Sequence, residues 1–516
     1  MSTALQTLAR WAIDLTPSEL PADVLERARM QHLALAGAAR AGVSLPAGRA
    51  AIKAASSRGG ARLLPSNRRG TRRDAVRFHA GAAAQLSLED GLLGGWTGAG
   101  AAASWGWARG STLDDLLAAT AVANEVAGRL GCALLLSEEP AARQAVIALS
   151  TAAAAARLQG LSAEQAAHAF ALALQSPRTV PGRIAFGAGD SRGRVAGESA
   201  SDGLLAVDAA RAGLQGPLDL LDDRGGLLTL SPLPLRPAFT GLGATWLTRT
   251  LSFKRHPVHD LLQVPVQAVA EILTRHIKAA DKRLRKDQVA SVTIKVTAPT
   301  LALETRAAAW PGLHPTGISR SVSRAVGALL TAHELTPTQL DAAWLEENRD
   351  SVARIASGVT LTHDWALTLG QLEHLFTAAS PLFTGVTASE LRDWMRGLIR
   401  SWGVALGAPG GRQALDALKL LPGRIQSRLR RESGDLSTFD EDEWRFKNAI
   451  DMRLYTIRGG WWPERRELPE GSPGWPWEDT RAIVQERSGL SPTDFGAAMS
   501  LAGDTDAQAW LETLSG

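Results

Sequence analysis

The segment from Phe253 to His259 carries the densest chemistry of the sequence. It places two cations, Lys254 and Arg255, and two imidazoles, His256 and His259, just before the start of a predicted helix. Amide groups at a helix N-terminus and cationic side chains both favour a bound anion. The segment therefore indicates an anion site, and a solvated basic turn is the alternative that composition by itself favours.

A second group of cations punctuates a glycine-rich loop, at Arg178, Arg183, Arg192 and Arg194. A guanidinium group suits a carboxylate because it can form two parallel hydrogen bonds with it. Solvated surface arginines are the alternative interpretation.

A carboxylate pair, Glu89 and Asp90, precedes another glycine-rich stretch. Such a pair serves either acid–base chemistry or the capping of a helix, and we favour the cap.

Gly98, Gly100 and Ala103 resemble the glycine pattern of a dinucleotide-binding site, but no β-branched strand precedes them. A nucleotide site is therefore not expected there.

The sequence contains no motif of several common enzyme and metal-binding sites. GxSxG, P-loop and HExxH patterns are absent, which removes the basis for a hydrolase, kinase or metalloprotease. The single cysteine, Cys132, cannot build a thiolate metal site or an internal disulfide. We expect neither a metal nor a cofactor.

Composition bounds the class of protein. A chain of 516 residues is too long for one hydrophobic core, so two or three domains are expected. The net charge of +4 is small, and the basic stretches 62–77 and 424–431 lack interleaved aromatic residues, so nucleic-acid binding is not implied. No stretch is apolar enough to span a membrane and no secretion signal is recognisable, so a cytoplasmic location is expected.

Periodicity predicts two kinds of structure that would position these residues. The first 250 residues are rich in alanine and leucine with helical spacing and are predicted to be all-α. The predicted helices there begin at Pro21 and include 113–130, 145–156 and 163–174. After Phe253 a helix over 264–276 is followed by alternating strands at 292–296, 359–362 and 450–457, which indicate an α+β unit with an antiparallel sheet. Residues 367–421 look like a helical insertion and 461–477 like a linker.

The order of several segments resembles the MmgE/PrpD family, which includes 2-methylcitrate dehydratase, cis-aconitate decarboxylase and iminodisuccinate epimerase. Lys254 to His259 (KRHPVH) is the most specific match. The remaining matches are LPADV at 20–24, NEVAGRLG at 124–131, AAAAARLQGL at 152–161, the glycine-spaced segment 197–217 and EGSP at 470–473.

The resemblance implies a mainly α fold, with an all-helical domain formed by both chain ends and an inserted α+β lid domain. The corresponding limits are 1–250 and 466–516 for the helical domain and 251–465 for the lid, with a helical insertion at about 367–440. The resemblance further implies a homodimer and a metal-free site in the cleft between the domains.

The family's functional positions are only partly retained. Lys254 and His259 match them and are the predicted catalytic residues, while Arg192, Lys254 and His256 are the predicted substrate-binding residues. Where the family has Asp-Phe-Asp-Asp-Thr this chain has SLEDG at 87–91, and His-Pro-Gly is replaced by Trp-Thr-Gly at 96–98. The loop at 137–143 has no histidine, and the family's site lysine appears as Arg192.

Two functions follow from this pattern. The first is a lyase or isomerase, of the dehydratase, decarboxylase or epimerase type, acting on a small di- or tricarboxylate with chemistry altered from that of 2-methylcitrate dehydratase. The alternative is a catalytically inactive relative that binds a ligand or a protein partner, with the inserted helices near Trp394 as a contact surface.

Overall fold

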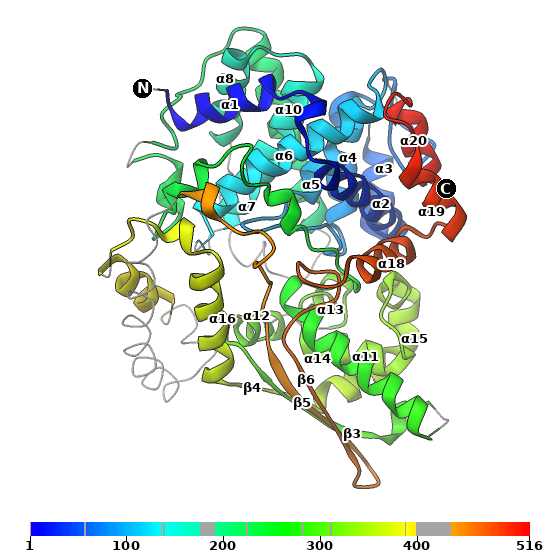
Figure 1. Cartoon of the computed structure of the whole chain (residues 1–516). Helices are drawn as coiled ribbons and strands as arrows, with labels where there is room; N and C mark the ends of the chain where they lie inside the picture. The colour runs from blue at the N-terminus through cyan, green and yellow to red at the C-terminus, as the bar shows by residue number, and fades with distance from the viewer. Residues whose placement is uncertain are drawn as a thin grey trace.

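The chain folds around two hydrophobic cores, a larger one of packed helices and a smaller one beside a β-sheet (Figure 1). These are seen in a computed structural model that describes residues 2–55, 58–135, 137, 140–175, 191–222, 225–280, 283–309, 312–387, 389–398 and 435–515. Arg178 and Arg183, the basic stretch 424–431, and residues 388 and 399–434 of the predicted insertion lie outside the described residues.

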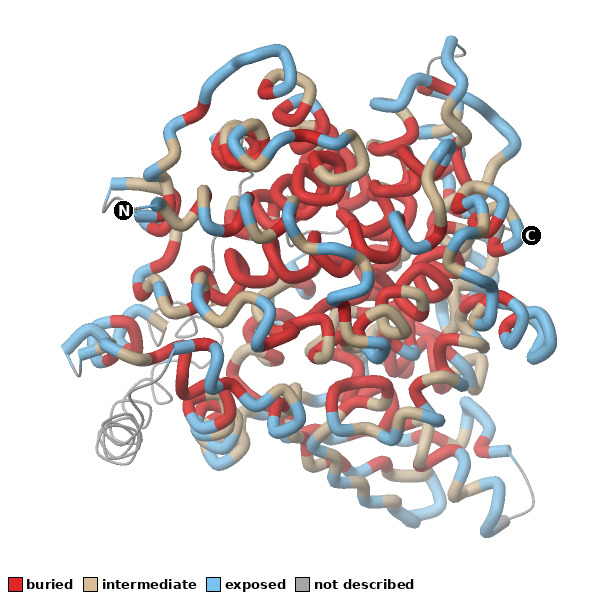
Figure 2. The backbone as a smooth tube through the Cα atoms, turned by 45° about the horizontal axis from the view of Figure 1, so that its top comes forward, coloured by how far each residue is buried: buried red, intermediate tan, exposed pale blue. Residues whose placement is uncertain are grey.

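The larger core is built by helices from both ends of the chain. Alanine dominates the buried faces, and its small side chain lets helix backbones approach closely. Buried backbone forms one continuous block across this part of the molecule (Figure 2). The helices from the first half are α1 (Ala4–Asp14), α2 (Ala22–Ser44), α3 (Pro46–Ala54), α4 (Arg72–Ala84), α5 (Gly98–Ala103), α6 (Leu113–Ala133), α7 (Pro140–Leu158), α8 (Ala163–Leu174) and α10 (Ser191–Arg211).

Short 3₁₀ turns connect these helices. They are η1 (Pro17–Glu19), η2 (Ser104–Trp107), η3 (Leu227–Leu230), η4 (Arg236–Phe239) and η5 (Leu247–Thr250).

The last helices of the chain return to this core. These are α18 (Trp477–Ser488), α19 (Pro492–Ser500) and α20 (Ala507–Ser515), drawn in red beside α2 in Figure 1. The contact requires glycine at position 37, because a Cβ atom there would lie 1.9 Å from the carbonyl oxygen of Arg487. A buried ion pair between Glu125 and Arg129, with their atoms 2.6 Å apart, fixes the centre of α6 as its i, i+4 spacing predicted.

The smaller core lies against a four-stranded sheet of order β4-β3-β5-β6. Its strands are β3 (Val289–Val296), β4 (Val359–His363), β5 (Ile450–Thr456) and β6 (Trp461–Arg466). Val292, Ile294, Met452 and Leu454 are buried and alternate with more exposed residues, as the two-residue period predicted. The helices of this part are α11 (Asp260–Ala280), α12 (Ala298–Ala308), α13 (Pro315–Ile318), α14 (Val322–Ala332) and α15 (Ala342–Ser357), with the short turns η6 (Lys286–Gln288) and η7 (Pro337–Leu340).

The mainly α fold with a small α+β part is thus confirmed, and three details of the prediction are wrong. The sheet is mixed, because β3 and β4 are parallel and are joined by a long crossover that contains α12 to α15. Residues 461–466 pair with β5 as an edge strand, which tolerates Pro463, so the predicted linker is shorter. The first half also contains a small antiparallel pair, β1 (Ala61–Arg62) with β2 (Arg69–Gly70).

The described part of the predicted insertion packs on the helical side. It comprises α16 (Trp365–Ala378), η8 (Ser380–Phe383), the helical residues 389–398 and η9 (Leu436–Thr438). Leu372, Phe376 and Trp394 belong to the larger core. Trp394 is only 5% exposed and packs edge-on against Phe376, so its indole is not a surface contact.

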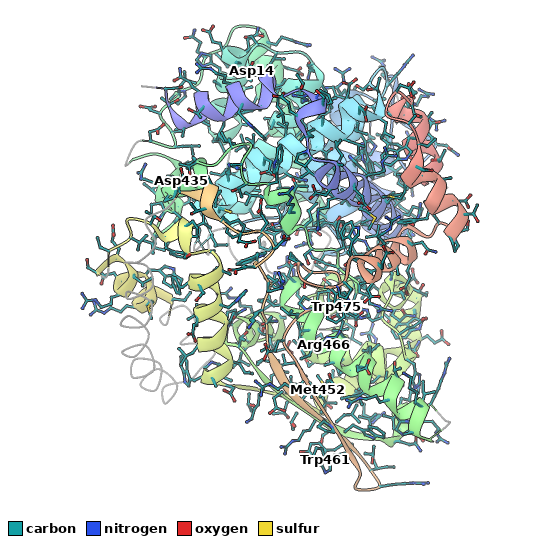
Figure 3. The ribbon with its side chains drawn as sticks, in the orientation of Figure 1. Asp14, Asp435, Met452, Trp461, Arg466 and Trp475 are labelled. Atoms are coloured by element: carbon teal, nitrogen blue, oxygen red, sulfur yellow. The ribbon has the colours of Figure 1, made fainter. Side chains whose placement is uncertain are left out.

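The distal end of the sheet points away from the helical core. Figure 3 shows Met452 within the sheet and Trp461 near the hairpin end, with Trp475 back toward the helices. Within the described ranges, no helix combines the length and the apolar character that crossing a membrane requires.

Candidate functional site

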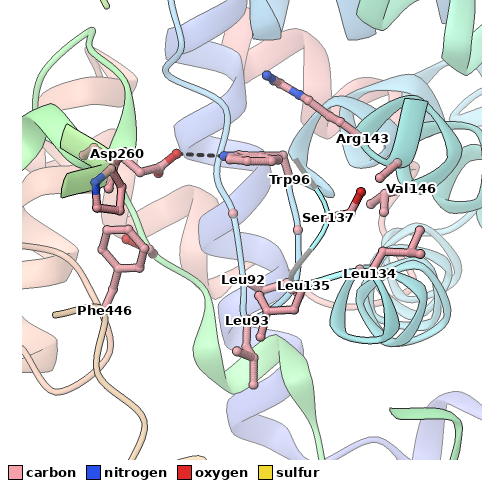
Figure 4. Close-up of a pocket in the computed structure, with 18 of the residues that line it drawn as sticks. Leu92, Leu93, Trp96, Leu134, Leu135, Ser137, Arg143, Val146, Asp260 and Phe446 are labelled. Carbon is pink, nitrogen blue, oxygen red and sulfur yellow. Dashed lines mark hydrogen bonds between the residues drawn. The ribbon is translucent and has the colours of Figure 1, made fainter. Parts of the chain in front are cut away.

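A cavity of about 500 Å³ opens where the two cores and the insertion meet. The helical part contributes residues 91–96, the end of α6, and faces of α7 and α10. The smaller core contributes the start of α11 and Arg320, the insertion contributes a face of α16, and residues 444–447 come from the segment that follows the insertion. Figure 4 shows polar side chains near Trp96 and Asp260, and several leucines gathered on another side.

Glu89 is the anchor for two arginines at the polar end. It is fully buried, and the guanidinium groups of Arg192 and Arg143 both donate to its Oε1 atom. Arg192 Nε also donates to the carbonyl oxygen of Ala84 across 2.7 Å, which fixes the guanidinium orientation. Burial by itself raises the pKa of Glu89, but Arg192, Lys254 and Arg143 bring it below its ordinary value. Glu89 is therefore a structural counter-ion, and its predicted role as a helix cap is wrong.

Positive charge exceeds negative charge at this end of the cavity. Three arginines, Arg143, Arg192 and Arg320, line it together with the carboxylate Asp260, while Glu89 and Lys254 pair with these residues from outside the lining. Burial, together with Arg192, lowers the pKa of Arg143 to about 10. Burial and the two neighbouring arginines lower the pKa of Arg320 well below its ordinary value. An anion bound here would relieve this repulsion.

Asp260 is the first residue of α11 and interacts with Trp96, Lys254 and His259. Trp96 Nε1 donates to its Oδ2 atom across 2.7 Å (Figure 4). Lys254 Nζ lies 3.3 Å from its Oδ1 atom. Burial alone raises the pKa of Asp260, but Lys254, His259 and the Trp96 indole lower it to about 2. The guanidinium of Arg143 lies 4.8 Å from the centre of the Trp96 ring, in cation–π geometry. Trp96 thus links two of the charged groups.

Lys254 reaches the cavity only through Asp260. Its side chain is 1% exposed, it does not line the cavity, and its Nζ donates to the carbonyl oxygen of Ser87 across 2.9 Å. The alternative of a solvated basic turn is therefore wrong for Lys254. It fits Arg255 better, whose side chain is 42% exposed and pairs with Glu470.

His259 lines the cavity beside Trp96, with the two ring centres 6.2 Å apart. Its Nδ1 atom accepts a hydrogen bond of 3.3 Å from the amide of Leu261, so the ring also caps the first turn of α11. Burial lowers the pKa of His259 well below its ordinary value; the neighbouring Asp260 raises this pKa, and Arg320, Lys254 and Arg192 lower it. The imidazole is neutral at neutral pH.

His256 lies apart from the cavity. Its Nδ1 atom is 3.0 Å from the carbonyl oxygen of Leu335, and burial lowers its pKa to about 4. It belongs to the packing between this loop and the smaller core. The structure thus brings Arg192 and His259 to one cavity, places Lys254 behind Asp260, and puts His256 elsewhere.

Asp90 forms a second buried ion pair next to the site. Arg487, from α18, donates to its Oδ1 atom across 2.9 Å and also to the carbonyl oxygen of Lys254. Burial raises the pKa of Asp90 to about 6 despite this partner. The pair connects the C-terminal helices to the loop that carries Lys254.

Sequence reasoning missed Arg143, Asp260 and Arg320. Asp260 follows directly after the histidine segment and was visible as a possible partner of Lys254. Arg143 lies at the end of the loop 137–143 in an alanine-rich stretch of α7, and Arg320 lies among serines before α14, and no local pattern marks either residue as part of the site. In the part of the chain that is described, no three histidine, cysteine, aspartate or glutamate side chains are grouped so as to hold a metal ion.

Comparison with known proteins supports the resemblance seen in the sequence. No curated protein matches the chain. Residues 6–231, which carry Glu89, Trp96, Arg143 and Arg192, match the family model of the MmgE/PrpD N-terminal domain. Over residues 6–231 the chain carries the N-terminal domain of the MmgE/PrpD family.

Proposed function

We propose that this protein binds a carboxylic acid in the cavity and acts on it as a lyase or isomerase of altered chemistry. The single observation that carries the proposal is the excess of cations around one cavity, with His259 in its wall. Arg192 and Arg143 hold the acid's carboxylate with charge-assisted hydrogen bonds, and Arg320 adds positive potential. Lys254 acts indirectly, by keeping Asp260 in place.

Acid–base chemistry fits this arrangement. Neutralising a carboxylate makes the hydrogen on the neighbouring carbon more acidic, and elimination of water, decarboxylation and epimerisation all use charge at that carbon. A bound anion also raises the pKa of His259 from its lowered value, because an opposite charge favours the imidazolium form. His259 therefore becomes a better base when the substrate is present.

Arginine-dependent binding is the first test. Arg192→Met should weaken binding of succinate and butyrate by roughly ten- to a hundredfold in isothermal titration, since hydrogen bonds to charged groups contribute about 1.5–3 kcal/mol. Arg192→Lys should give an intermediate loss because the charge stays while the paired geometry goes. Arg194→Met is the matched control, because Arg194 is exposed on the same helix two residues away. Equal binding by parent and Arg192→Met would contradict the proposed site.

Solvent-deuterium exchange tests the chemistry. The parent protein should exchange a carbon-bound hydrogen of an accepted acid, and His259→Ala should slow the exchange by about a hundredfold to ten-thousandfold. His168→Ala, on α8 and hydrogen-bonded to Gly216, serves as the control. Exchange that persists in His259→Ala would remove His259 from catalysis.

Binding without exchange would instead support the non-catalytic alternative. The observation that favours this alternative is the replacement of the family's His-Pro-Gly by Trp96, Thr97 and Gly98, since the Trp96 indole is a donor only. A homodimer and a cytoplasmic location remain part of the proposal through the family resemblance. Light scattering after size-exclusion chromatography would report the mass in solution.

A further inference from the structure

Most of the cavity wall beyond the charged end is hydrocarbon. Leu92, Leu134, Leu135 and Ile147 come from the helical part, Leu375 comes from the insertion, and Phe446 comes from the segment that follows it. Figure 4 shows Leu92, Leu93, Leu134 and Leu135 on one side of the pocket, with Arg143 on the opposite side of Trp96. The cavity therefore has a charged end and an apolar end.

The two cations that border the apolar end direct their charges elsewhere. Arg445 donates to the carbonyl oxygen of Trp444 across 2.7 Å, and its guanidinium lies against Gly474. Lys447 Nζ lies 3.7 Å from a carboxylate oxygen of Glu467. A second carboxylate of the substrate would find no directed cation at this end among the described residues.

The volume also exceeds what a compact acid fills. At about 500 Å³ the cavity falls within the ~300–1,000 Å³ range of sites for larger organic ligands, whose walls are mostly apolar with a few polar groups that fix orientation. A compact tricarboxylate would occupy the charged end and leave water against leucine and phenylalanine side chains, which is unfavourable.

We infer that the substrate class is a carboxylic acid with an extended hydrocarbon group, whose carboxylate lies at Arg143 and Arg192 and whose hydrocarbon part lies between Leu135 and Leu375. This inference rests on the proposed function, because it assumes that the charged end binds a carboxylate. It changes the expected ligand from a small di- or tricarboxylate to an amphipathic monoacid.

A series of straight-chain acids tests the inference. Isothermal titration of the full-length protein with acetate, butyrate, hexanoate and octanoate, all below micelle-forming concentrations, should show Kd falling by about fourfold per added methylene until the cavity is full. Primary alcohols of the same lengths should bind at least tenfold more weakly, since they lack the charge that the arginines hold.

Two variants localise the hydrocarbon. Leu375→Asn should flatten the dependence of Kd on chain length while leaving the Kd of acetate unchanged, because it makes one wall polar. Leu367→Asn is the matched control, since Leu367 is half-buried on the same helix and does not line the cavity. Leu135→Asn tests the wall that the helical part contributes, and circular dichroism verifies that each variant is folded.

The outcomes separate the two proposals. A Kd that stays constant or rises with chain length, while butyrate or succinate still binds, would overturn the hydrocarbon inference and leave the carboxylate site standing. Alcohols that bind as tightly as the acids would overturn the role of the arginines. Failure of every acid to bind, short or long, would overturn both.

Discussion

Trp96 and Asp260 are joined by a hydrogen bond of 2.7 Å that ties the loop before α5 to the first turn of α11. One residue belongs to the helical part of the chain and the other begins the part that carries the sheet. The bond therefore holds together the two walls of the charged end. The Trp96 side chain has no second donor that could replace this bond, since the indole carries a single N–H group.

Removing that donor should loosen the junction. Trp96→Phe keeps an aromatic ring but loses the indole N–H and its hydrogen bond to a charged acceptor, so the free energy of unfolding should fall by about 1.5–3 kcal/mol in urea titrations at pH 7. Trp461→Phe, at an exposed position on β6, should change it by less than about 0.5 kcal/mol. Equal losses in both variants would show that the bond to Asp260 contributes nothing specific.

Lys254 should be needed for folding as much as for function. Lys254→Met leaves the Asp260 carboxylate and the Ser87 carbonyl without their cation, and breaking a largely buried pair costs about 3–5 kcal/mol. Lys295→Met removes an exposed lysine 3.6 Å from Asp364 and should cost about 0–1 kcal/mol. Chemical denaturation of both variants measures the difference, and a loss below about 1 kcal/mol for Lys254→Met would contradict the buried pair.

Buried neutral histidines should make the fold sensitive to acid. Burial lowers the pKa of His79 to about 3, and its Nε2 atom accepts a hydrogen bond of 2.9 Å from the amide of Leu64. The unfolded chain takes up this proton near pH 6.5 and the folded chain does not, so the stability from this residue is full above pH 6.5 and is lost as pH falls toward 3.

The substitution His79→Gln isolates that effect. Its amide oxygen can accept the same hydrogen bond but does not titrate, so the unfolding free energy should depend on pH less steeply than in the parent, by about 1.4 kcal/mol per pH unit between roughly pH 4 and 6. Urea titrations across this range provide the measurement, with His168→Gln as the control. Parallel curves for parent and His79→Gln would show that His79 titrates alike in both states.

Gly131 should be irreplaceable in the cavity wall. A Cβ atom at this position on α6 would lie 1.8 Å from the carbonyl oxygen of Gly94, so Gly131→Ala must displace the loop and should cost about 1–3 kcal/mol and weaken acid binding. Gly370 lies in α16 with nothing within 4 Å of its added Cβ, and Gly370→Ala should stabilise by about 0.5–1 kcal/mol. Thermal unfolding of the pair checks both signs, and a neutral Gly131→Ala would argue against the tight contact.

Local sequence patterns predicted the positions of two helices in the first half well. The predicted helix at 163–174 matches α8, and the predicted stripe at 113–130 lies within α6. Alternation likewise located β3, β4 and β5. The parallel pairing of β3 with β4 was not predictable, because two strands with the same alternation can pair in either direction and the crossover decides.

The sequence by itself determined the mainly α fold, the resemblance to the MmgE/PrpD family and the segment that carries Lys254 and His259, because periodicity and residue order are local properties of a chain. Only the tertiary structure decided that Arg143 and Arg320 join Arg192, that Asp260 stands between Lys254 and Trp96, and that leucines fill the far side of the cavity. These residues are far apart along the chain, and their interaction depends on distance and burial in space, which spacing in the sequence does not encode.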